Sequence, residues 1–188
     1  MEPAATLTDG EVRLRRWRDN DVAEVHEAVN ESLDHLAPFM PWAVDGYSEA
    51  KAADFLRQAR EEWLAGEAFA YAILGADDEV IGSCSLMRRI GEDGLEIGYW
   101  LAADATGRGL ATRASALLTA EAFRIGARFV EIHHDPANER SGLIPQRLGY
   151  TRIGTRPASE PGGTAGTGKR VVWRTEAGAP ERWGDRNP

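Results

Sequence analysis

Hydrophobic and polar positions along the chain repeat with two periods, and the change of period separates predicted strands from predicted helices. Alternating apolar side chains predict strands over residues 11–17, 68–74, 79–88, 94–102, 129–134, 150–156 and 169–175. Apolar side chains three or four positions apart predict helices over residues 20–30, 48–66, 110–124 and 138–148. The segment 33–42 is interrupted by prolines and predicts a short helix or turn that leads into a loop.

The order of these elements is β-α-α-β-β-β-α-β-α-β-β, which predicts a mixed α/β fold. The pattern shows no internal repeat and no second domain, so residues 1–176 are expected to form a single domain. The connection 157–168 is rich in Gly, Pro and Ser and is expected to be mobile. The tail 177–188 has little to bury and is expected to be flexible.

The composition of the 188-residue chain is that of an ordinary globular protein, with 43% hydrophobic and 28% charged residues. The formal net charge of −8 argues against a nucleic-acid partner, because such proteins need a basic surface against the phosphates. The same acidity suits a cationic acceptor such as an amine, although it is equally common among cytosolic proteins of other functions.

The chain is expected to be cytoplasmic and to have no membrane partner. No stretch approaches the roughly 18 uninterrupted apolar residues of a membrane span. The first residues, Met1 to Ala5, do not resemble a signal peptide. Cys84 is the one cysteine, so an intramolecular disulfide is excluded, and its apolar neighbours indicate a thiol packed in the core.

The segment most informative about function runs from Glu96 to Ala111, where a strand leads into a glycine-containing loop and the loop leads into a helix. The first amides of a helix lack an intrahelical partner, and the helix dipole makes that end positive. Gly107 and Gly109 let the backbone approach an anion closely, so a pyrophosphate could bind there. An ordinary strand-to-helix turn explains the spacing equally well. Neither a Rossmann fingerprint nor a P-loop is complete, which disfavours those nucleotide-binding classes.

Two motifs in the correct order resemble the GNAT superfamily of N-acetyltransferases. The sequence Thr-Gly-Arg-Gly-Leu-Ala at 106–111 resembles the family's motif A, Gln/Arg-x-x-Gly-x-Gly/Ala, with Thr106 in place of the long side chain at its head. Asn-Glu-Arg-Ser at 138–141, followed by Leu-Gly-Tyr at 148–150, is similar to the second signature of the family.

The beginning of the chain resembles the Rim-type branch of this superfamily, which acetylates the N-termini of ribosomal proteins. This part of the resemblance rests on residues 13–15, residues 32–36 and Met-Pro-Trp-Ala at 40–43. The whole resemblance covers about residues 11–175. It implies the GNAT fold, a mixed, mostly antiparallel sheet with helices on both faces that is splayed between the fourth and fifth predicted strands.

The resemblance also implies where coenzyme A binds. Amides of the loop would hold the pyrophosphate, and the pantetheine would lie in the splay as a pseudo-strand, with an amide near Leu101 facing the acetyl carbonyl. Asn138 would hydrogen-bond the pantetheine or the strand end. The residues implied in cofactor binding are Trp100, Leu101, Ala102, Thr106, Gly107, Arg108, Gly109, Leu110, Ala111, Thr112, Asn138 and Ser141.

Direct transfer without an acyl-enzyme is the mechanism that the resemblance implies, and it needs a base for the ammonium and an acid for the leaving thiolate. Glu96 is expected to be the base, directly or through water. A solvated carboxylate at a strand end is the alternative interpretation of Glu96. Ser141 is expected to lie near the sulfur, where its hydroxyl could act as the acid.

Trp42, Tyr99 and His134 are expected to line the acceptor side. Trp42 lies in the proline-bracketed loop, where an aromatic side chain would exclude water, and packing on the core is its alternative. His133 and His134 point to opposite faces of one strand, so no more than one can face the cleft. A packed, hydrogen-bonded core histidine is the favoured interpretation of each, and His134 is kept as a candidate.

The sequence thus predicts an N-acetyltransferase that moves an acetyl group from acetyl-CoA to a primary amine through a tetrahedral intermediate. Acetyl-CoA is the cosubstrate, and no metal is expected because no metal-spaced cluster of His, Cys and Asp is present. The acceptor is either a protein N-terminus or a small-molecule amine, and the chain could form a homodimer. The alternative is a CoA-binding sensor or scaffold of the same fold without turnover.

Overall fold

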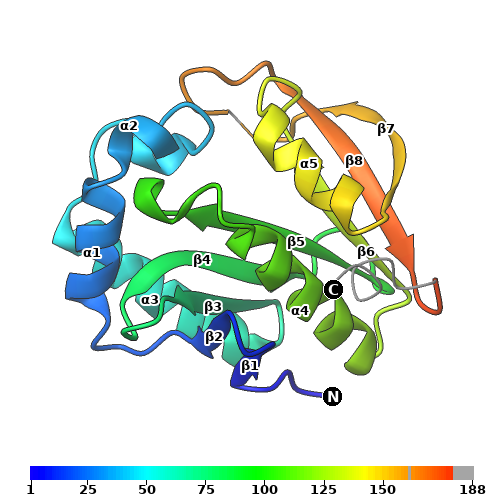
Figure 1. Ribbon diagram of the computed structural model, residues 1–188, viewed down its shortest axis with the longest axis horizontal. Helices are drawn as coiled ribbons and strands as arrows, with labels where there is room; N and C mark the ends of the chain where they lie inside the picture. The colour runs from blue at the N-terminus through cyan, green and yellow to red at the C-terminus, as the bar shows by residue number, and fades with distance from the viewer. Residues whose placement is uncertain (161, 180–188) are drawn as a thin grey trace.

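The computed structural model describes residues 1–160 and 162–179, and its central element is an eight-stranded sheet (Figure 1). The strands are β1 Thr6–Thr8, β2 Arg13–Arg16, β3 Ala68–Leu74, β4 Val80–Met87, β5 Gly94–Leu101, β6 Phe129–His134, β7 Thr151–Pro157 and β8 Lys169–Glu176. The helices are α1 Val22–Asn30, α2 Leu33–Leu36, α3 Glu49–Ala65, α4 Leu110–Arg124 and α5 Glu139–Arg147, with short 3-10 turns η1 Pro41–Ala43 and η2 Ala103–Ala105. The predicted flexible tail lies outside the described residues from residue 180 onward.

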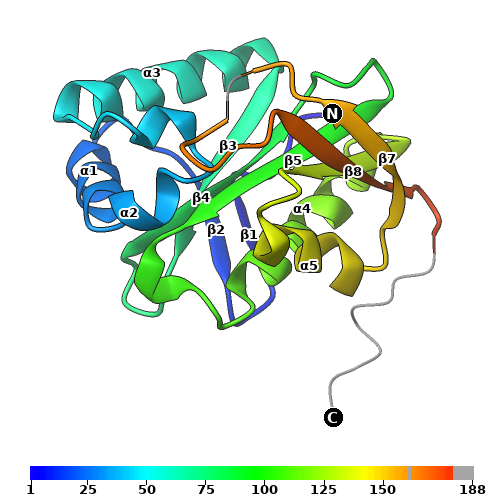
Figure 2. The ribbon, with the colours of Figure 1, turned by 90° about the horizontal axis from the view of Figure 1, so that it is seen from above.

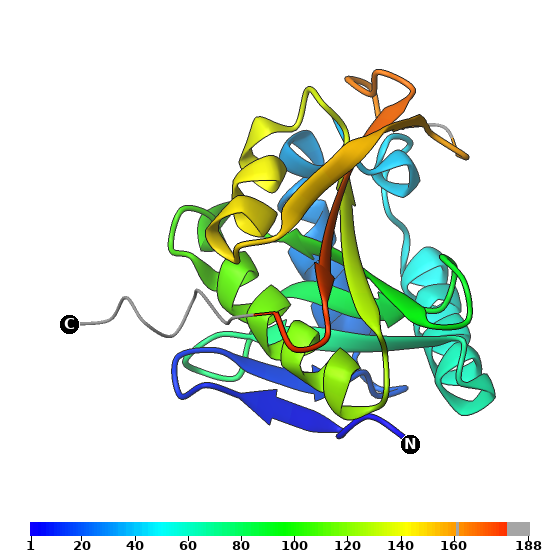
Figure 3. The same cartoon turned by 90° about the vertical axis from the view of Figure 1, so that its right-hand side faces the viewer.

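The sheet has the order β1-β2-β3-β4-β5-β6-β8-β7 and is antiparallel except between β5 and β6. These two parallel strands pair only over Gly94–Ile97 and Phe129–Ile132. Beyond that point β5 continues along β4 to Leu101, and β6 continues along β8 to His134. The two strands therefore separate, which confirms the predicted splay. Figure 3 shows the blue N-terminal strands at one edge of the sheet and the orange C-terminal strands at the other.

Helices α1, α2 and α3 cover one face of the sheet, and α4 and α5 cover the other (Figure 2). The sequence of β3 explains how both layers fit. Phe69, Tyr71 and Ile73 belong to the apolar cluster beneath α4, whereas the intervening Ala70 and Ala72 face α1 and α3. The alanines leave room for α3 to lie close to the sheet, so β3 is buried along its whole length.

Local signals set the ends of the predicted helices. The Ser48 hydroxyl accepts a hydrogen bond from the Lys51 amide and caps α3, and Gly66 ends the helix in a left-handed conformation with φ of +74°. Within the described residues, no helix is both long enough and apolar enough to pass through a membrane.

Strand β1 was not predicted, because three residues are too few to show a period. It forms at the edge of the sheet, where Thr6–Thr8 pair with Arg13–Arg15. Two contacts with distant parts of the chain hold the segment before it. The Tyr71 hydroxyl donates to the Ala4 carbonyl at 2.8 Å, and the Ala4 amide donates to the Glu121 carboxylate at 2.6 Å. Tertiary contacts therefore decide this strand.

Candidate active site

The loop between β5 and α4 is shaped to receive an anion. Gly107 and Gly109 have φ of +79° and +75°, in the left-handed region that favours glycine. A Cβ at either position would meet no atom of the described chain within 4 Å, so the loop is open above both glycines. Gly109 is the N-cap of α4, and the sequence of its first turn contains no carboxylate. The first amides of α4 therefore form an accessible positive end that fits a diphosphate.

Side chains around the loop contribute differently from the backbone. Thr106 donates its hydroxyl to the Ala103 carbonyl at 2.8 Å, so this short side chain braces the loop from within. The side chains of Leu110, Ala111 and Thr112 are buried in the core, and only their amides can face a ligand. Arg108 is exposed at the tip of the loop.

Strand β5 divides its side chains between the two faces of the sheet. Leu101 is buried in the cluster beneath α4, whereas the Trp100 ring lies on the opposite face, 5.9 Å from the ring of Trp42. The Trp100 side chain therefore points away from the face of α4, and its predicted role in cofactor binding would have to come from its backbone. The Ala102 amide donates to the Ile81 carbonyl in β4. Because successive amides of a strand point to opposite edges, the Leu101 amide points into the splay.

Two hydroxyl groups meet beside the splay, one from β5 and one from α5. Tyr99 Oη lies 2.8 Å from Ser141 Oγ and also donates to the Ser141 carbonyl at 3.2 Å. That carbonyl is free because Pro145, one helical turn later, has no amide hydrogen to donate to it. Burial raises the pKa of Tyr99 to about 12, although the hydrogen bond with Ser141 opposes this rise. Both hydroxyl groups are therefore protonated at neutral pH.

Asn138 serves as the N-cap of α5. The Asn138 side-chain oxygen accepts a hydrogen bond from the backbone amide of Ser141 at 3.2 Å, and the backbone amide of Asn138 donates to the Asp135 carbonyl. This capping role is different from the predicted contact with pantetheine. It fixes the first turn of α5 and, with it, the position of the Ser141 hydroxyl opposite Tyr99.

A cavity of about 1150 Å³ opens on the face of the sheet that Trp100 occupies. Its floor consists of the small residues Ala70, Ser83, Ser85 and Gly98. Its wall is aromatic and includes Phe39, Trp42, Tyr47, Phe55 and Trp100. The ring of Trp42 contacts both Tyr47, at 5.6 Å between centroids, and Trp100. Trp42 therefore lies where the sequence predicted, in the wall of the cavity.

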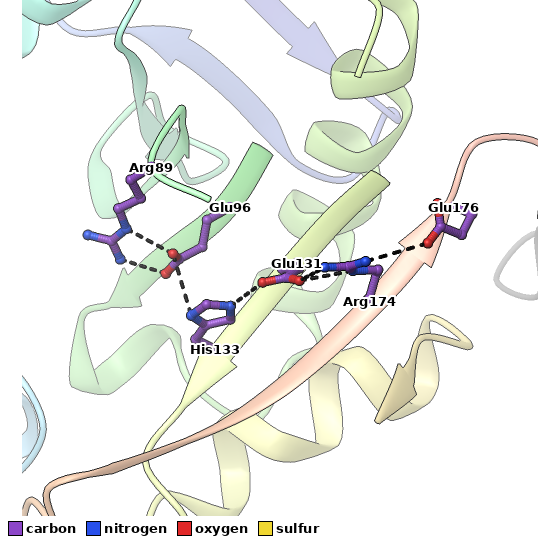
Figure 4. Close-up of polar contacts among 6 residues, drawn as sticks. All are labelled: Arg89, Glu96, Glu131, His133, Arg174 and Glu176. Atoms are coloured by element: carbon purple, nitrogen blue, oxygen red, sulfur yellow. Dashed lines mark hydrogen bonds and ion pairs between the residues drawn. The ribbon is translucent and has the colours of Figure 1, made fainter. Parts of the chain in front are cut away.

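The other end of the cavity carries charged groups from neighbouring strands (Figure 4). Arg89 donates to both carboxylate oxygens of Glu96, at 2.8 and 2.5 Å. His133 bridges the two strands, with Nδ1 3.5 Å from Glu96 and Nε2 2.6 Å from Glu131. Arg174 donates to the far side of Glu131 at 2.9 and 2.5 Å. Glu96 is thus a buried, ion-paired carboxylate and not a solvated strand end.

The neighbouring histidine, His134, is a packed core residue. Its Nδ1 contacts the Asp135 carbonyl at 2.9 Å, and its Nε2 accepts a hydrogen bond from the Trp173 indole at 3.1 Å. Burial lowers the pKa of His134, so the imidazole is neutral. With both ring nitrogens occupied, His134 has no free atom for an acceptor, and the core interpretation of the sequence describes it better than a substrate-binding role. Both histidines line the cavity, and His133, on the opposite face of β6, is the one that contacts Glu96.

Comparison with known proteins identifies the family of this fold. Residues 11–151 match the family model described as an acetyltransferase (GNAT) domain. The chain belongs to the GNAT acetyltransferase family. The predicted family is therefore confirmed, and with it an enzyme that transfers an acetyl group from acetyl-CoA, its cosubstrate, to an amine. A search of curated protein sequences found no match.

Solved structures show the same GNAT fold. RimJ of Mycobacterium smegmatis in complex with a CoA disulfide is 21% identical, covers 97% of this chain and 94% of its own, and has a TM-score of 0.83. RimL, a ribosomal α-N-protein acetyltransferase in complex with coenzyme A, is 21% identical, with coverage of 89% and 95% and a TM-score of 0.78. The microcin C7 self-immunity acetyltransferase MccE, in complex with acetyl-CoA and AMP, is 19% identical, with coverage of 89% and 93% and a TM-score of 0.81.

Three charged residues of this GNAT site were not predicted from the sequence: Arg89, Glu131 and Arg174. One signal could have found Glu131, because a carboxylate inside the apolar strand Phe129–His134 must be buried and therefore needs a partner. No sequence pattern places it beside Glu96. Among the described residues, no cluster of His, Cys, Asp and Glu has the arrangement of a metal site.

The connection between β7 and β8 contacts the segment after α2 and the end of β6 in the GNAT domain. The amides of Thr164 and Ala165 donate to the carbonyls of Ala37 and Pro38, at 3.0 and 2.9 Å. Asp135 accepts hydrogen bonds from the amide and the hydroxyl of Thr167, at 2.7 and 2.9 Å. These contacts give the described part of the connection a fixed path, whereas the sequence alone suggested mobility.

Asp135→Asn is expected to lower the free energy of unfolding by about 1–3 kcal/mol at neutral pH. Burial raises the pKa of Asp135, but the hydrogen bonds from Ala137 and Thr167 outweigh burial and hold that pKa below its ordinary value. A lowered folded-state pKa means that the stabilisation exists above the unfolded-state pKa and is lost as pH falls through the folded-state pKa. Urea denaturation should therefore show that the difference in the free energy of unfolding between Asp135→Asn and wild type becomes smaller at acidic pH. The exposed Asp104→Asn serves as control.

Proposed function

We propose that this chain is a cytoplasmic acetyltransferase that acetylates the N-terminal amine of a protein by direct attack on acetyl-CoA. The observation that carries the proposal is the splay between β5 and β6, where one cavity is lined both by Glu96 and by the hydroxyl groups of Tyr99 and Ser141. An acetyl group held in the splay would face an acceptor in the cavity. The names of RimL and RimJ among the similar structures support a protein N-terminus as acceptor.

Acetyl-CoA would lie with its diphosphate on the amides of residues 109–112 and its pantetheine along the free edge of β5. The Leu101 amide, which points into the splay, would donate to the thioester carbonyl and stabilise the oxyanion of the tetrahedral intermediate. The donor is a backbone group of a paired strand, so its position does not depend on a side-chain rotamer.

Glu96 would accept the proton of the incoming ammonium, directly or through a water molecule. Its carboxylate lines the cavity and is held by Arg89, so its direction is fixed before the substrate arrives. Cys84 is not a rival nucleophile, because it is buried and burial raises the pKa of its thiol above the ordinary value.

The leaving thiolate would receive its proton from Ser141. When the Tyr99 hydroxyl donates to Ser141 Oγ, the proton of Ser141 is free to be donated to the sulfur. The hydrogen bond from Tyr99 then stabilises the Ser141 alkoxide that forms. The high pKa of Tyr99 keeps this second proton in place at neutral pH. The Ser141–Tyr99 pair would therefore protonate the thiolate of coenzyme A from the side of the splay opposite to Glu96.

Ser141→Ala is expected to lower kcat by about 10²-fold, because it removes the hydroxyl that protonates the thiolate. Tyr99→Phe should lower kcat less, since Ser141 keeps its own proton. The acetyl-CoA dissociation constant should change little in either variant. Steady-state kinetics with calorimetric titration of acetyl-CoA would check this. A larger loss in Tyr99→Phe than in Ser141→Ala would instead point to Tyr99 as the donor.

A small-molecule amine is the second candidate acceptor, and the aromatic wall of the cavity favours it. Trp42, Phe55 and Trp100 could cover a planar ring in the way that aromatic pockets bind small ligands. The MccE structure, which contains AMP beside acetyl-CoA, has the same fold. The proposal for a protein N-terminus is favoured because two of the similar structures are Rim proteins.

An acceptor screen would test the proposed function. Peptides beginning with each amino acid and a panel of small amines would be incubated with acetyl-CoA, and CoA release would be followed with a thiol reagent. Mass spectrometry would locate the acetyl group. Transfer to the α-amine of peptides is expected. Transfer to small amines alone would establish the second candidate, and acetyl-CoA binding without CoA release would indicate a sensor or scaffold.

A further inference from the structure

The charged groups on the acceptor face form a continuous line that extends beyond Glu96. Figure 4 shows Arg89, Glu96, His133, Glu131, Arg174 and Glu176 in this order, with each in contact with the next. The two central carboxylates are buried, with Glu96 5% and Glu131 1% exposed. Burying two carboxylates side by side is costly unless both are paired, so this arrangement requires an explanation.

The strand register brings the two carboxylates together. Glu96 and Glu131 are direct neighbours across the parallel pair β5–β6, at the end of the paired stretch. His133 lies two residues beyond Glu131 and therefore on the same face, just where the strands begin to separate. The imidazole can turn back between the two carboxylates because β5 no longer occupies that space. Its side chain remains 16% exposed toward the cavity.

The two contacts of His133 differ. The 2.6 Å contact between Nε2 and Glu131 is a strong hydrogen bond, whereas Nδ1 lies 3.5 Å from Glu96. With Nε2–H donating to Glu131, Nδ1 of the neutral ring carries a lone pair that faces Glu96. A proton arriving on Glu96 could therefore pass to Nδ1 across a short gap.

The line of charged groups carries one net negative charge, which one additional proton would neutralise. Arg89 and Arg174 balance two of the three glutamates, and one negative charge remains when His133 is neutral. An imidazolium at His133 would bring the line to neutrality. Burial raises the pKa of Glu131, but the hydrogen bonds from His133 and Arg174 outweigh it and hold that pKa below its ordinary value. Glu131 therefore stays ionised and can hold an imidazolium.

We propose that His133 relays the proton that Glu96 removes from the acceptor amine, and that Glu131 stabilises the resulting imidazolium. This inference rests on the proposed function. The ammonium gives one proton to Glu96, which passes it to His133 Nδ1, and the amine lone pair attacks the thioester carbonyl. Glu96, emptied by the relay, accepts the second proton of the nitrogen as the C–S bond breaks. The thiolate gains a proton from Ser141, which regains one from solvent, so that one proton is released per turnover. His133 then releases its proton to solvent through the cavity, so Glu96 is free for the next turnover.

His133 acts through Glu96 in this scheme and is a positioning and relay residue. Other charged groups facing the same cavity are Arg156, Glu160 and Arg170 on the β7–β8 side and Lys51 and Asp54 on α3. His134 provides the contrast on the same strand. Its two nitrogens contact neutral partners, Trp173 and the Asp135 carbonyl, so it can neither receive nor release a proton in the cavity.

Two variants test the relay. His133→Gln keeps a donor toward Glu131 but cannot carry a proton, and it should lower kcat by about 10²-fold with unchanged acetyl-CoA affinity. His133→Ala should be equally impaired and should regain activity when imidazole is added, whereas His133→Gln should not. The exposed His35→Gln is the matched control and should behave as wild type.

The wild-type enzyme gives an independent measurement that does not depend on whether a variant folds. Rates in mixtures of H₂O and D₂O should show a curved proton inventory, because two protons move in the base path. A linear inventory, or wild-type kinetics in His133→Gln while Glu96→Gln is inactive, would overturn the relay and leave the proposed function intact. If the wild-type enzyme acetylates no amine in the screen, the proposed function fails and the relay fails with it.

Discussion

Acetyl-CoA binding should be lost in Gly109→Glu, with a dissociation constant raised at least about 100-fold, or about 3 kcal/mol. A glutamate at the N-cap of α4 would place its carboxylate on the amides that receive the diphosphate and would repel the diphosphate itself. The structure leaves space for the side chain, because an added Cβ would meet no atom of the described chain within 4 Å. Isothermal titration calorimetry with acetyl-CoA measures the effect.

Gly109→Gln is the matched control for this prediction, since it has the same shape without the charge. Both variants carry the strain of a non-glycine residue at φ of +75°, which costs about 1–3 kcal/mol of stability. Both should therefore melt at similarly lowered temperatures, but only the glutamate should prevent binding. Undiminished binding in Gly109→Glu would place the diphosphate elsewhere, and equal loss in both variants would assign the effect to the loop conformation.

Glu96→Gln is expected to lower kcat by about 10²- to 10⁴-fold while the acetyl-CoA dissociation constant stays close to wild type. The amide cannot accept the ammonium proton at neutral pH. Cofactor affinity should be unaffected because Glu96 points to the cavity face, whereas the glycine loop and α4 lie on the other face. Steady-state kinetics and calorimetry, both at several pH values, separate the two effects.

Arg89→Gln provides the control, because it removes the partner of Glu96 and keeps the carboxylate. The Arg89 side chain is 54% exposed, but its partner Glu96 is buried, so the loss of Arg89 should lower the stability of the fold while reducing kcat less than Glu96→Gln does. Thermal melting of both variants would show whether the fold is intact. A Glu96→Gln enzyme with wild-type kcat would remove Glu96 from the base role and assign proton removal to another group.

The backbone conformation of the glycine loop could be predicted from the sequence. The chemistry of this loop resides in the backbone, and the need for positive φ at Gly107 and Gly109 is written in the residue types themselves. Residues 110–112 were predicted to act through their backbone amides, and the position of a backbone amide does not depend on the side chain. The direction of the Trp100 side chain could not be predicted in this way, since a side chain in a strand faces one side or the other and a shift of one residue reverses the assignment.

The acceptor side could be predicted only in part. Trp42 was expected there, but Arg89, Glu131 and Arg174 come from elements that are distant along the chain. His133 and His134 were recognised as lying on opposite faces, although which of them contacts Glu96 depends on which face of β6 the helices cover. Strand β1 was not predicted because the residue that precedes it, Ala4, is held by Tyr71 and Glu121, which are distant along the chain.

The sequence by itself determined the order of the elements after β1 and the turn chemistry of the glycine loop. These features depend on local periodicity and on backbone conformations that only glycine adopts easily. The tertiary structure alone decided that β5 and β6 part after Ile97 and that Glu96 and Glu131 lie side by side. Strand register joins residues far apart in the chain through interactions that no local pattern records, and the chemistry on the acceptor face depends on that register.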